Sequence, residues 1–210
     1  MPEQKDATKF TEAANNNLLS ELNWDDTQDC ELASRGYIAS LTDPFITDTN
    51  GRSVWDVNAF PFLEEETAPP TVNPSLWLQS RLNALYHGLF KVTEGVYQIR
   101  GFDLSVMSII ETDSGFLAID PLLTASTVHA GMELVCQYVG QKPIVAVIYT
   151  HSHIDHWGGV KGVISEAERD ALTRGILNSL GIVASLTTAC LLLPHPKVHS
   201  KEANERNVLV

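Results

Sequence analysis

Residues 150–162 read THSHIDHWGGVKG, and this stretch decides the fold. Four potential metal ligands lie within six positions of it: His151, His153, Asp155 and His156. The preceding run from Ile144 to Thr150 is apolar and β-branched, which predicts a strand buried on both faces. Gly158 and Gly159 follow, and glycine is typical of positions where the backbone turns sharply or lies close to another segment. The sequence predicts a buried strand that delivers polar ligands at its carboxyl end.

The spacing of the four ligands predicts two pairs. Alternate residues of an extended chain point to the same side, so His151 and His153 can face one ion. Asp155 and His156 can face a second ion a few ångströms away, as in two-metal hydrolytic sites. Imidazole with carboxylate suits zinc, and iron or manganese is compatible with the same ligands. The alternative is a solvated loop rich in histidine. Four other histidines do not belong to such a dense cluster of potential ligands and are expected to be structural or exposed: His87, His129, His195 and His199.

The chain before the motif predicts half of an αββα sandwich. Strands are expected at 92–100, 104–110 and 116–119, followed by a helix at 124–138. Asp120 ends the third strand, where it either orients a ligand histidine or forms an Asp-Pro turn. Asn73 as a cap and Pro74 at the first helical position predict a helix to about Tyr86, with apolar side chains facing a core. Those side chains are Leu76, Leu82 and Leu85.

Charge and cysteine content exclude some partners. The net charge is −12, and the first 74 residues hold 14 acidic and 4 basic side chains. Nucleic acid is not expected as a partner, because phosphate binding needs basic patches. Three cysteines far apart in the sequence predict free thiols and a reducing compartment. The amino terminus lacks the apolar run of a signal peptide, so a cytoplasmic location is expected.

The carboxyl-terminal part differs in composition from the rest. Residues 176–193 are mostly apolar, but they are interrupted by polar residues and are short for a membrane helix. A membrane tail anchor is the weaker interpretation, and no membrane partner is expected. The stronger ones are a buried helix covering the sheet, or a sequence foreign to the preceding domain. A capping box at 165–168 predicts a helix start.

Several separated motifs resemble the alkyl sulfatases of the metallo-β-lactamase superfamily, which hydrolyse dodecyl sulfate. Besides HSHIDH they are VWD (54–56), TVNPSLW (71–77), GVYQIRGFDL (95–104) and IDPL (119–122). The resemblance runs from about residue 5 to about residue 167. It implies a mixed α/β (α+β) fold in three parts: a helical and loop-rich extension (1–90), the first half of a metallo-β-lactamase αββα sandwich (91–167) and a divergent tail (168–210).

The resemblance also implies a chemistry. It assigns His151 and His153 to one zinc, and Asp155 and His156 to the second. The expected reaction releases an alcohol and sulfate from an alkyl sulfate ester with water, and Asp155 is the expected catalytic carboxylate. Family members continue for several hundred residues past this motif, with further zinc ligands and a region that forms homodimers. The expectation is therefore a truncated, inactive chain that holds one zinc ion tightly, or none. The alternatives are a non-catalytic fragment that binds one metal or a partner chain, and another hydrolase of the superfamily.

Overall fold

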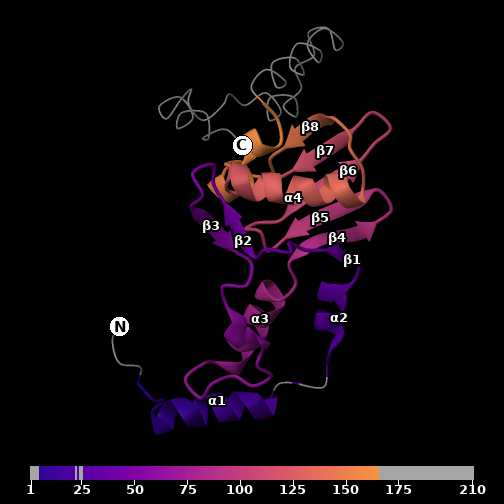
Figure 1. Cartoon of the computed structure of the whole chain (residues 1–210). Helices are drawn as coiled ribbons and strands as arrows, with labels where there is room; N and C mark the ends of the chain where they lie inside the picture. The colour runs from indigo at the N-terminus through magenta and orange to yellow at the C-terminus, as the bar shows by residue number, and fades with distance from the viewer. Residues whose placement is uncertain (1–4, 22, 24–25, 166–210) are drawn as a thin grey trace, which may run out of the picture.

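The computed structural model describes residues 5–21, 23 and 26–165. Its centre is a six-stranded mixed sheet covered on one face by a helix (Figure 1). In spatial order the strands are β1 (Tyr37–Ala39), β4 (Gly88–Thr93), β5 (Val96–Arg100), β6 (Met107–Glu111), β7 (Phe116–Ile119) and β8 (Ile144–Ile148). A second sheet pairs β2 (Phe45–Thr47) with β3 (Ser53–Asp56). The helices are α1 (Lys9–Glu21), α2 (Gln28–Ser34), α3 (Pro74–Ala84) and α4 (Ala125–Tyr138). Three short 3-10 helices complete the described part: η1 (Pro61–Glu64), η2 (Ile154–His156) and η3 (Val160–Gly162).

The unit β7–α4–β8 places the motif. Strands β7 and β8 run parallel, so a crossover must join them, and α4 is that crossover. Thr124 caps α4, because its hydroxyl oxygen accepts the amide N–H of Thr127 at 3.2 Å. The helix ends at Tyr138, as its apolar period predicts. Since parallel strands end at the same edge of a sheet, the loops after β7 and β8 meet there.

The core lies between the six-stranded sheet and α4. The fully buried side chains Ile99, Met107 and Ile109 come from the sheet, and Val128 and Val135 come from α4. Burying apolar side chains of this size contributes about 1.5–3 kcal/mol each to folding. The core therefore holds β7 and β8, and the loops that follow them, in fixed positions.

Three strand predictions are corrected by the structure. The strand predicted at 104–110 is β6, which begins only at Met107, because residues 101–105 form bends of the preceding loop. The segment 92–100 contains the end of β4, a turn at residues 94–95 and all of β5 instead of one strand, because Gly95 adopts a φ of +70° that breaks the extended chain. The strand predicted to be buried on both faces, β8, is half-buried along its length. It is the last strand of the sheet within the described residues, so one of its edges has no strand beside it there.

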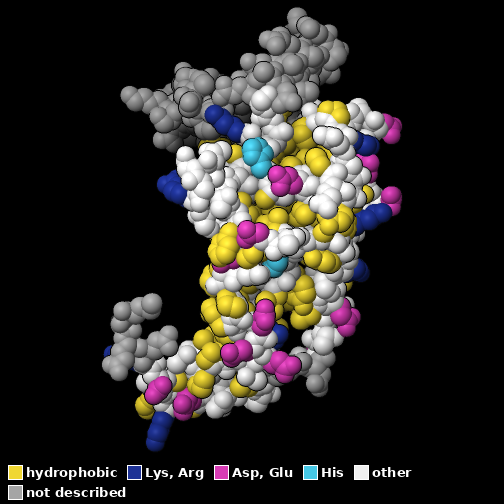
Figure 2. Space-filling model, in the orientation of Figure 1, with side chains coloured by type: hydrophobic (Ala, Val, Ile, Leu, Met, Phe, Trp, Pro, Cys, Tyr) yellow, Lys and Arg dark blue, Asp and Glu magenta, His cyan; other side chains and the backbone are white. Residues whose placement is uncertain are grey.

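Helix α3 contacts η1 and the amino-terminal helices α1 and α2. Its Trp77 is 5% exposed, and the indole N–H donates to the carbonyl of Glu65 at 3.3 Å. Leu76 was predicted to face the core, but it is 59% exposed because Trp77 occupies the inward position next to it. Figure 2 shows hydrophobic and acidic side chains intermingled on the surface over α1 and α3. The region 1–90, predicted to be a helical and loop-rich extension, also contains β1, which pairs with β4 at the edge of the main sheet.

The cap of α3 gives a first testable prediction. The side-chain oxygen of Asn73 accepts the amide N–H groups of Ser75 at 2.9 Å and Leu76 at 3.2 Å. The substitution Asn73→Ala is expected to lower the free energy of unfolding by about 1 kcal/mol, because it removes both bonds. Urea unfolding measures it. The exposed Asn83→Ala near the end of the same helix is the control, and an equal loss in both variants would contradict a capping role for Asn73.

Other parts of the chain fall outside the description. No helix within the described ranges combines the length and the apolar character needed to cross a bilayer. The predicted tail anchor at 176–193, His195, His199 and the tail at 168–210 lie outside the described residues.

Candidate metal centre

The four predicted ligands lie together just after β8. The strand ends at Ile148, whose carbonyl accepts the amide N–H of Asp120 at 2.9 Å. The loop then carries His151 and His153, and the single turn η2 contains Asp155 and His156. The ring centroids of His151 and His156 are 4.0 Å apart, and those of His151 and His153 are 4.7 Å apart.

The ligand atoms are arranged as two pairs. His151 Nε2 lies 3.1 Å from His153 Nδ1, and His156 Nε2 lies 3.3 Å from Asp155 Oδ2. Two ligand atoms bound at about 2.1 Å to one tetrahedral zinc ion are separated by roughly 3.4 Å. Both pairs therefore have the spacing of one edge of a zinc tetrahedron, and their donor types fit zinc. No three His, Cys, Asp or Glu side chains within the described ranges are grouped to hold one ion.

Asp120 connects the end of β7 to both pairs. Its carboxylate accepts the amide N–H of Thr150 at 2.7 Å and the Thr150 hydroxyl at 2.6 Å. It also lies 2.9 Å from His156 Nδ1. Burial would raise the pKa of Asp120, but the bonds from Thr150 and the contact with His156 outweigh burial and lower it. At neutral pH the side chain is an anion that only accepts hydrogen bonds.

The anionic Asp120 determines where the histidine protons lie. Because it can only accept, Nδ1 of His156 must carry a proton, so Nε2 is the nitrogen with which the neutral ring would bind a metal. The Thr150 hydroxyl uses its one hydrogen on Asp120, so its oxygen accepts from Nδ1 of His151 at 2.9 Å. The lone pair of His151 Nε2 then faces His153. One carboxylate thus prepares a nitrogen ligand in each pair.

The sequence left two interpretations of Asp120 open, and the structure shows features of both. Its φ of +53° and the hydrogen bond from the Leu122 amide N–H to its carbonyl, at 2.7 Å, form a tight turn. Its side chain contacts His156. That His151, His153, Asp155 and His156 bind metal stays a prediction.

The glycines after the motif allow close packing, as predicted. Gly159 donates its amide N–H to the carbonyl of Leu122 at 2.9 Å. A Cβ atom on Gly158 would lie 2.4 Å from the carbonyl oxygen of Leu123, and one on Gly159 would lie 2.3 Å from that of Pro121. The loop after β8 therefore lies directly on the loop after β7, and any larger residue would separate them.

The loop between β5 and β6 also contacts the motif, which the sequence did not predict. Ser105 donates its hydroxyl hydrogen to the backbone carbonyl of Asp155. Asp103, two residues earlier, is 7% exposed and accepts hydrogen bonds from the amide N–H of Leu123 and the hydroxyl of Thr127. These contacts join residues up to 50 positions apart. The one available signal was the segment GVYQIRGFDL (95–104), which contains Asp103 and ends one residue before Ser105.

Two other histidines lie apart from the motif and behave as predicted. His87 is half-buried and bonds the Ser40 hydroxyl through Nδ1 at 2.7 Å, and burial lowers its pKa. His129 is exposed on α4.

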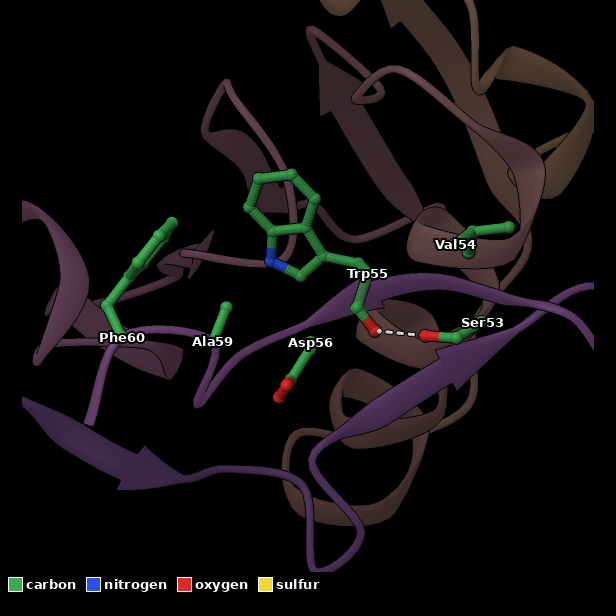
Figure 3. A pocket seen from close by; sticks show the side chains of 6 residues that line it. All are labelled: Ser53, Val54, Trp55, Asp56, Ala59 and Phe60. Carbon is green, nitrogen blue, oxygen red and sulfur yellow. Dashed lines mark hydrogen bonds between the residues drawn. The ribbon is translucent and has the colours of Figure 1, made fainter. Parts of the chain in front are cut away.

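A separate hollow of about 290 Å³ lies beside β3 (Figure 3). Its lining residues are Ser53, Val54, Trp55, Asp56, Ala59 and Phe60. It contains one carboxylate and no histidine or cysteine, so its lining does not resemble a metal site. The indole N–H of Trp55 bonds to a residue outside the hollow, donating to the carbonyl of Gly101 at 2.9 Å. That contact anchors the start of the loop that carries Asp103.

Comparison with known proteins gives the same family as the motifs. Residues 100–168 match the Metallo-beta-lactamase superfamily. The chain is 46% identical over 180 residues to a linear primary-alkylsulfatase of Pseudomonas sp., covering 85% of this chain and 27% of the relative. It is 44% identical over 188 residues to an alkyl/aryl-sulfatase of Saccharomyces cerevisiae, covering 90% of this chain and 29% of the relative.

A solved structure shares the fold. The stereoselective inverting sec-alkylsulfatase from Pseudomonas sp. superposes with a TM-score of 0.75 at 46% identity, covering 80% of this chain and 26% of that one. The chain thus spans about a quarter of the length of these relatives. Most of its sequence and its mixed α/β fold match theirs, and residues 100–168, which include the HSHIDH loop, match the superfamily, so the chain belongs to the alkylsulfatase family of the metallo-β-lactamase superfamily.

Proposed function

We propose that this chain forms part of a zinc-dependent hydrolase that cleaves alkyl sulfate esters into an alcohol and sulfate. The observation that carries the proposal is the spacing of ligand atoms after β8, 3.1 Å between His151 Nε2 and His153 Nδ1 and 3.3 Å between His156 Nε2 and Asp155 Oδ2. The relatives that match over four fifths of the chain or more are named as sulfatases, which favours sulfate esters over other substrates of the superfamily.

The chemistry follows from the donor set. Zinc, when bound, supplies a Lewis acid that lowers the pKa of water and stabilises negative charge on an ester oxygen. Asp120 and Thr150 keep the protons of His156 and His151 on Nδ1, so both Nε2 atoms stay available as ligands. The carboxylate of Asp155 is 26% exposed, which lets it accept a hydrogen bond from a reacting water and orient it. Substrate reaches this loop from its exposed side, where His151 and His153 lie.

A second candidate function is metal binding without turnover. The described residues supply two ligands to each pair, whereas catalytic zinc sites have three protein ligands. A chain with only these pairs would hold zinc weakly and would hydrolyse ester slowly.

Zinc content and sulfate release distinguish these functions. The full chain is purified, loaded with zinc and incubated with octyl sulfate below its critical micelle concentration, so that the detergent does not unfold the protein. A hydrolase predicts sulfate release that a chelator removes and zinc restores, whereas metal binding without turnover predicts bound zinc and no release. The substitution Asp155→Asn is expected to abolish it, while Asp113→Asn, in an exposed turn, retains it.

The outcomes separate the two candidates. Zinc bound without any sulfate release would contradict the hydrolase and leave metal binding. A chain that binds no zinc would contradict both, and so would zinc content that stays unchanged when His151→Ala and His153→Ala are both introduced.

A further inference from the structure

The loop between β5 and β6 contains a buried carboxylate that has no cationic partner among the described residues. Asp103 is 7% exposed, and the hydrogen bonds it accepts come from neutral groups. Oδ1 accepts the amide N–H of Ser105 at 3.0 Å. Oδ2 accepts the amide N–H of Leu123 and the hydroxyl of Thr127, both at 2.8 Å. Burying a carboxylate costs free energy, and these three bonds offset that cost by satisfying it.

The three donors belong to different parts of the fold. Ser105 lies in the same loop as Asp103, Leu123 follows the turn that Asp120 begins, and Thr127 is in the first turn of α4. Trp55 fixes the start of the Asp103 loop through the carbonyl of Gly101. Asp103 therefore locks the β5–β6 loop onto the same β7–α4 connection that carries Asp120.

Ser105 extends this lock to the motif. Its hydroxyl donates to the backbone carbonyl of Asp155, and Ser105 itself is 7% exposed, so water does not compete freely for the contact. The carbonyl belongs to the residue whose side chain lies 3.3 Å from His156 Nε2. Holding this peptide fixes the backbone position from which the Asp155 side chain extends. Asp120 holds the His156 ring through its Nδ1 atom.

We propose that Asp103 and Ser105 are positioning residues that set the metal geometry of the Asp155–His156 pair by holding the backbone of Asp155. The proposal rests on the metal site proposed above and adds residues from a loop outside the motif. Residues that orient metal ligands typically contribute about 10- to 100-fold to metal affinity. Because Ser105 acts on a peptide and not on a ligand atom, the lower end is expected.

Cobalt substitution tests this inference. Cobalt(II) takes the same ligands as zinc, and its visible absorption reports their geometry. In the full chain, Ser105→Ala is expected to shift the cobalt spectrum. It is also expected to weaken zinc binding at the Asp155–His156 pair about 10-fold, as measured by competition with a chelator. The control is Ser108→Ala, which removes a hydroxyl that accepts from Gln98 Nε2 at 3.3 Å in the sheet, away from the motif. It should leave the spectrum and the affinity unchanged.

The readouts separate this inference from the metal site itself. Thermal unfolding of Ser105→Ala confirms that the variant is folded when its spectrum is recorded. If zinc binds and is lost in Asp155→Ala, but Ser105→Ala has the wild-type spectrum and affinity, the positioning role is wrong and the metal site stands. If the wild-type chain binds neither zinc nor cobalt, both proposals are wrong. A spectral shift of equal size in Ser108→Ala would also overturn the positioning role.

Discussion

Replacing Asp120 by asparagine is expected to weaken zinc binding about 100-fold while the chain stays folded. The carboxylate accepts from Thr150 Oγ1 at 2.6 Å and lies 2.9 Å from His156 Nδ1. An amide nitrogen at this position would donate to both groups. Nδ1 of His156 would then have to accept, which moves its proton to Nε2, and a protonated Nε2 cannot bind zinc. Residues that orient ligand histidines contribute 10- to 100-fold each, and this one acts on both pairs.

The same substitution has a second consequence at His151. If the Thr150 hydroxyl accepts from the amide, its hydrogen points to His151 Nδ1, and the proton of that ring also moves to Nε2. Both pairs lose a nitrogen lone pair through one change of side chain. Zinc affinity measured by chelator competition should therefore fall for both sites together.

Asparagine should cost little stability at this position. Its remaining oxygen still accepts the amide N–H of Thr150, and asparagine tolerates the φ of +53° better than most residues. The control is Asp48→Asn, since Asp48 also accepts backbone bonds, from Asn50 at 2.9 Å and Arg52 at 3.0 Å, but lies in another loop. Zinc affinity within threefold of the wild type in Asp120→Asn would contradict the proton arrangement described here.

The sequence predicted well what depends on local pattern. The helix predicted at 124–138 and the strand predicted at 116–119 follow from their apolar periods, and the helix begins one residue later because Thr124 is its N-cap. The two glycines after the motif predicted close backbone contact because glycine is the residue that permits it. Alternation along an extended chain predicted that His151 and His153 face the same side, and their nearest ring nitrogens lie 3.1 Å apart. That they bind a metal stays a prediction.

What the sequence did not predict depends on contacts between distant segments. Asp103 and Ser105 bond to residues 20 to 50 positions away, and the one local signal, the segment GVYQIRGFDL, does not indicate which residues they contact. The turn at Gly95 was missed because apolar residues continue on both sides of it, so the period of two hid the break. Leu76 was placed in the core because its helix position allows it, but the larger Trp77 is the residue that is buried.

The packing of the motif loop gives the largest expected effect on stability, at Gly159. Its φ of −83° suits any residue, so the backbone conformation imposes no cost on alanine. The cost of alanine is steric. An added Cβ would lie 2.3 Å from the Pro121 carbonyl oxygen, 2.6 Å from Val128 Cγ2 and 2.7 Å from the Thr124 carbonyl oxygen. Two of these atoms are backbone, and the third belongs to a fully buried side chain, so none can move without shifting α4 or its connection to β7.

Gly159→Ala is therefore expected to lower the free energy of unfolding by about 3 kcal/mol, the upper end for overpacking a buried contact. Gly51→Ala is the matched control, because Gly51 has a φ of +78° with nothing within 4 Å of an added Cβ. It should lose about 1 kcal/mol from backbone strain alone. Urea unfolding of both variants compares steric cost with conformational cost. If Gly159→Ala unfolds at the same urea concentration as Gly51→Ala or later, the loop after β8 is not packed on residues 121–128. The position of His156 beside Asp120 would then need another explanation than this packing.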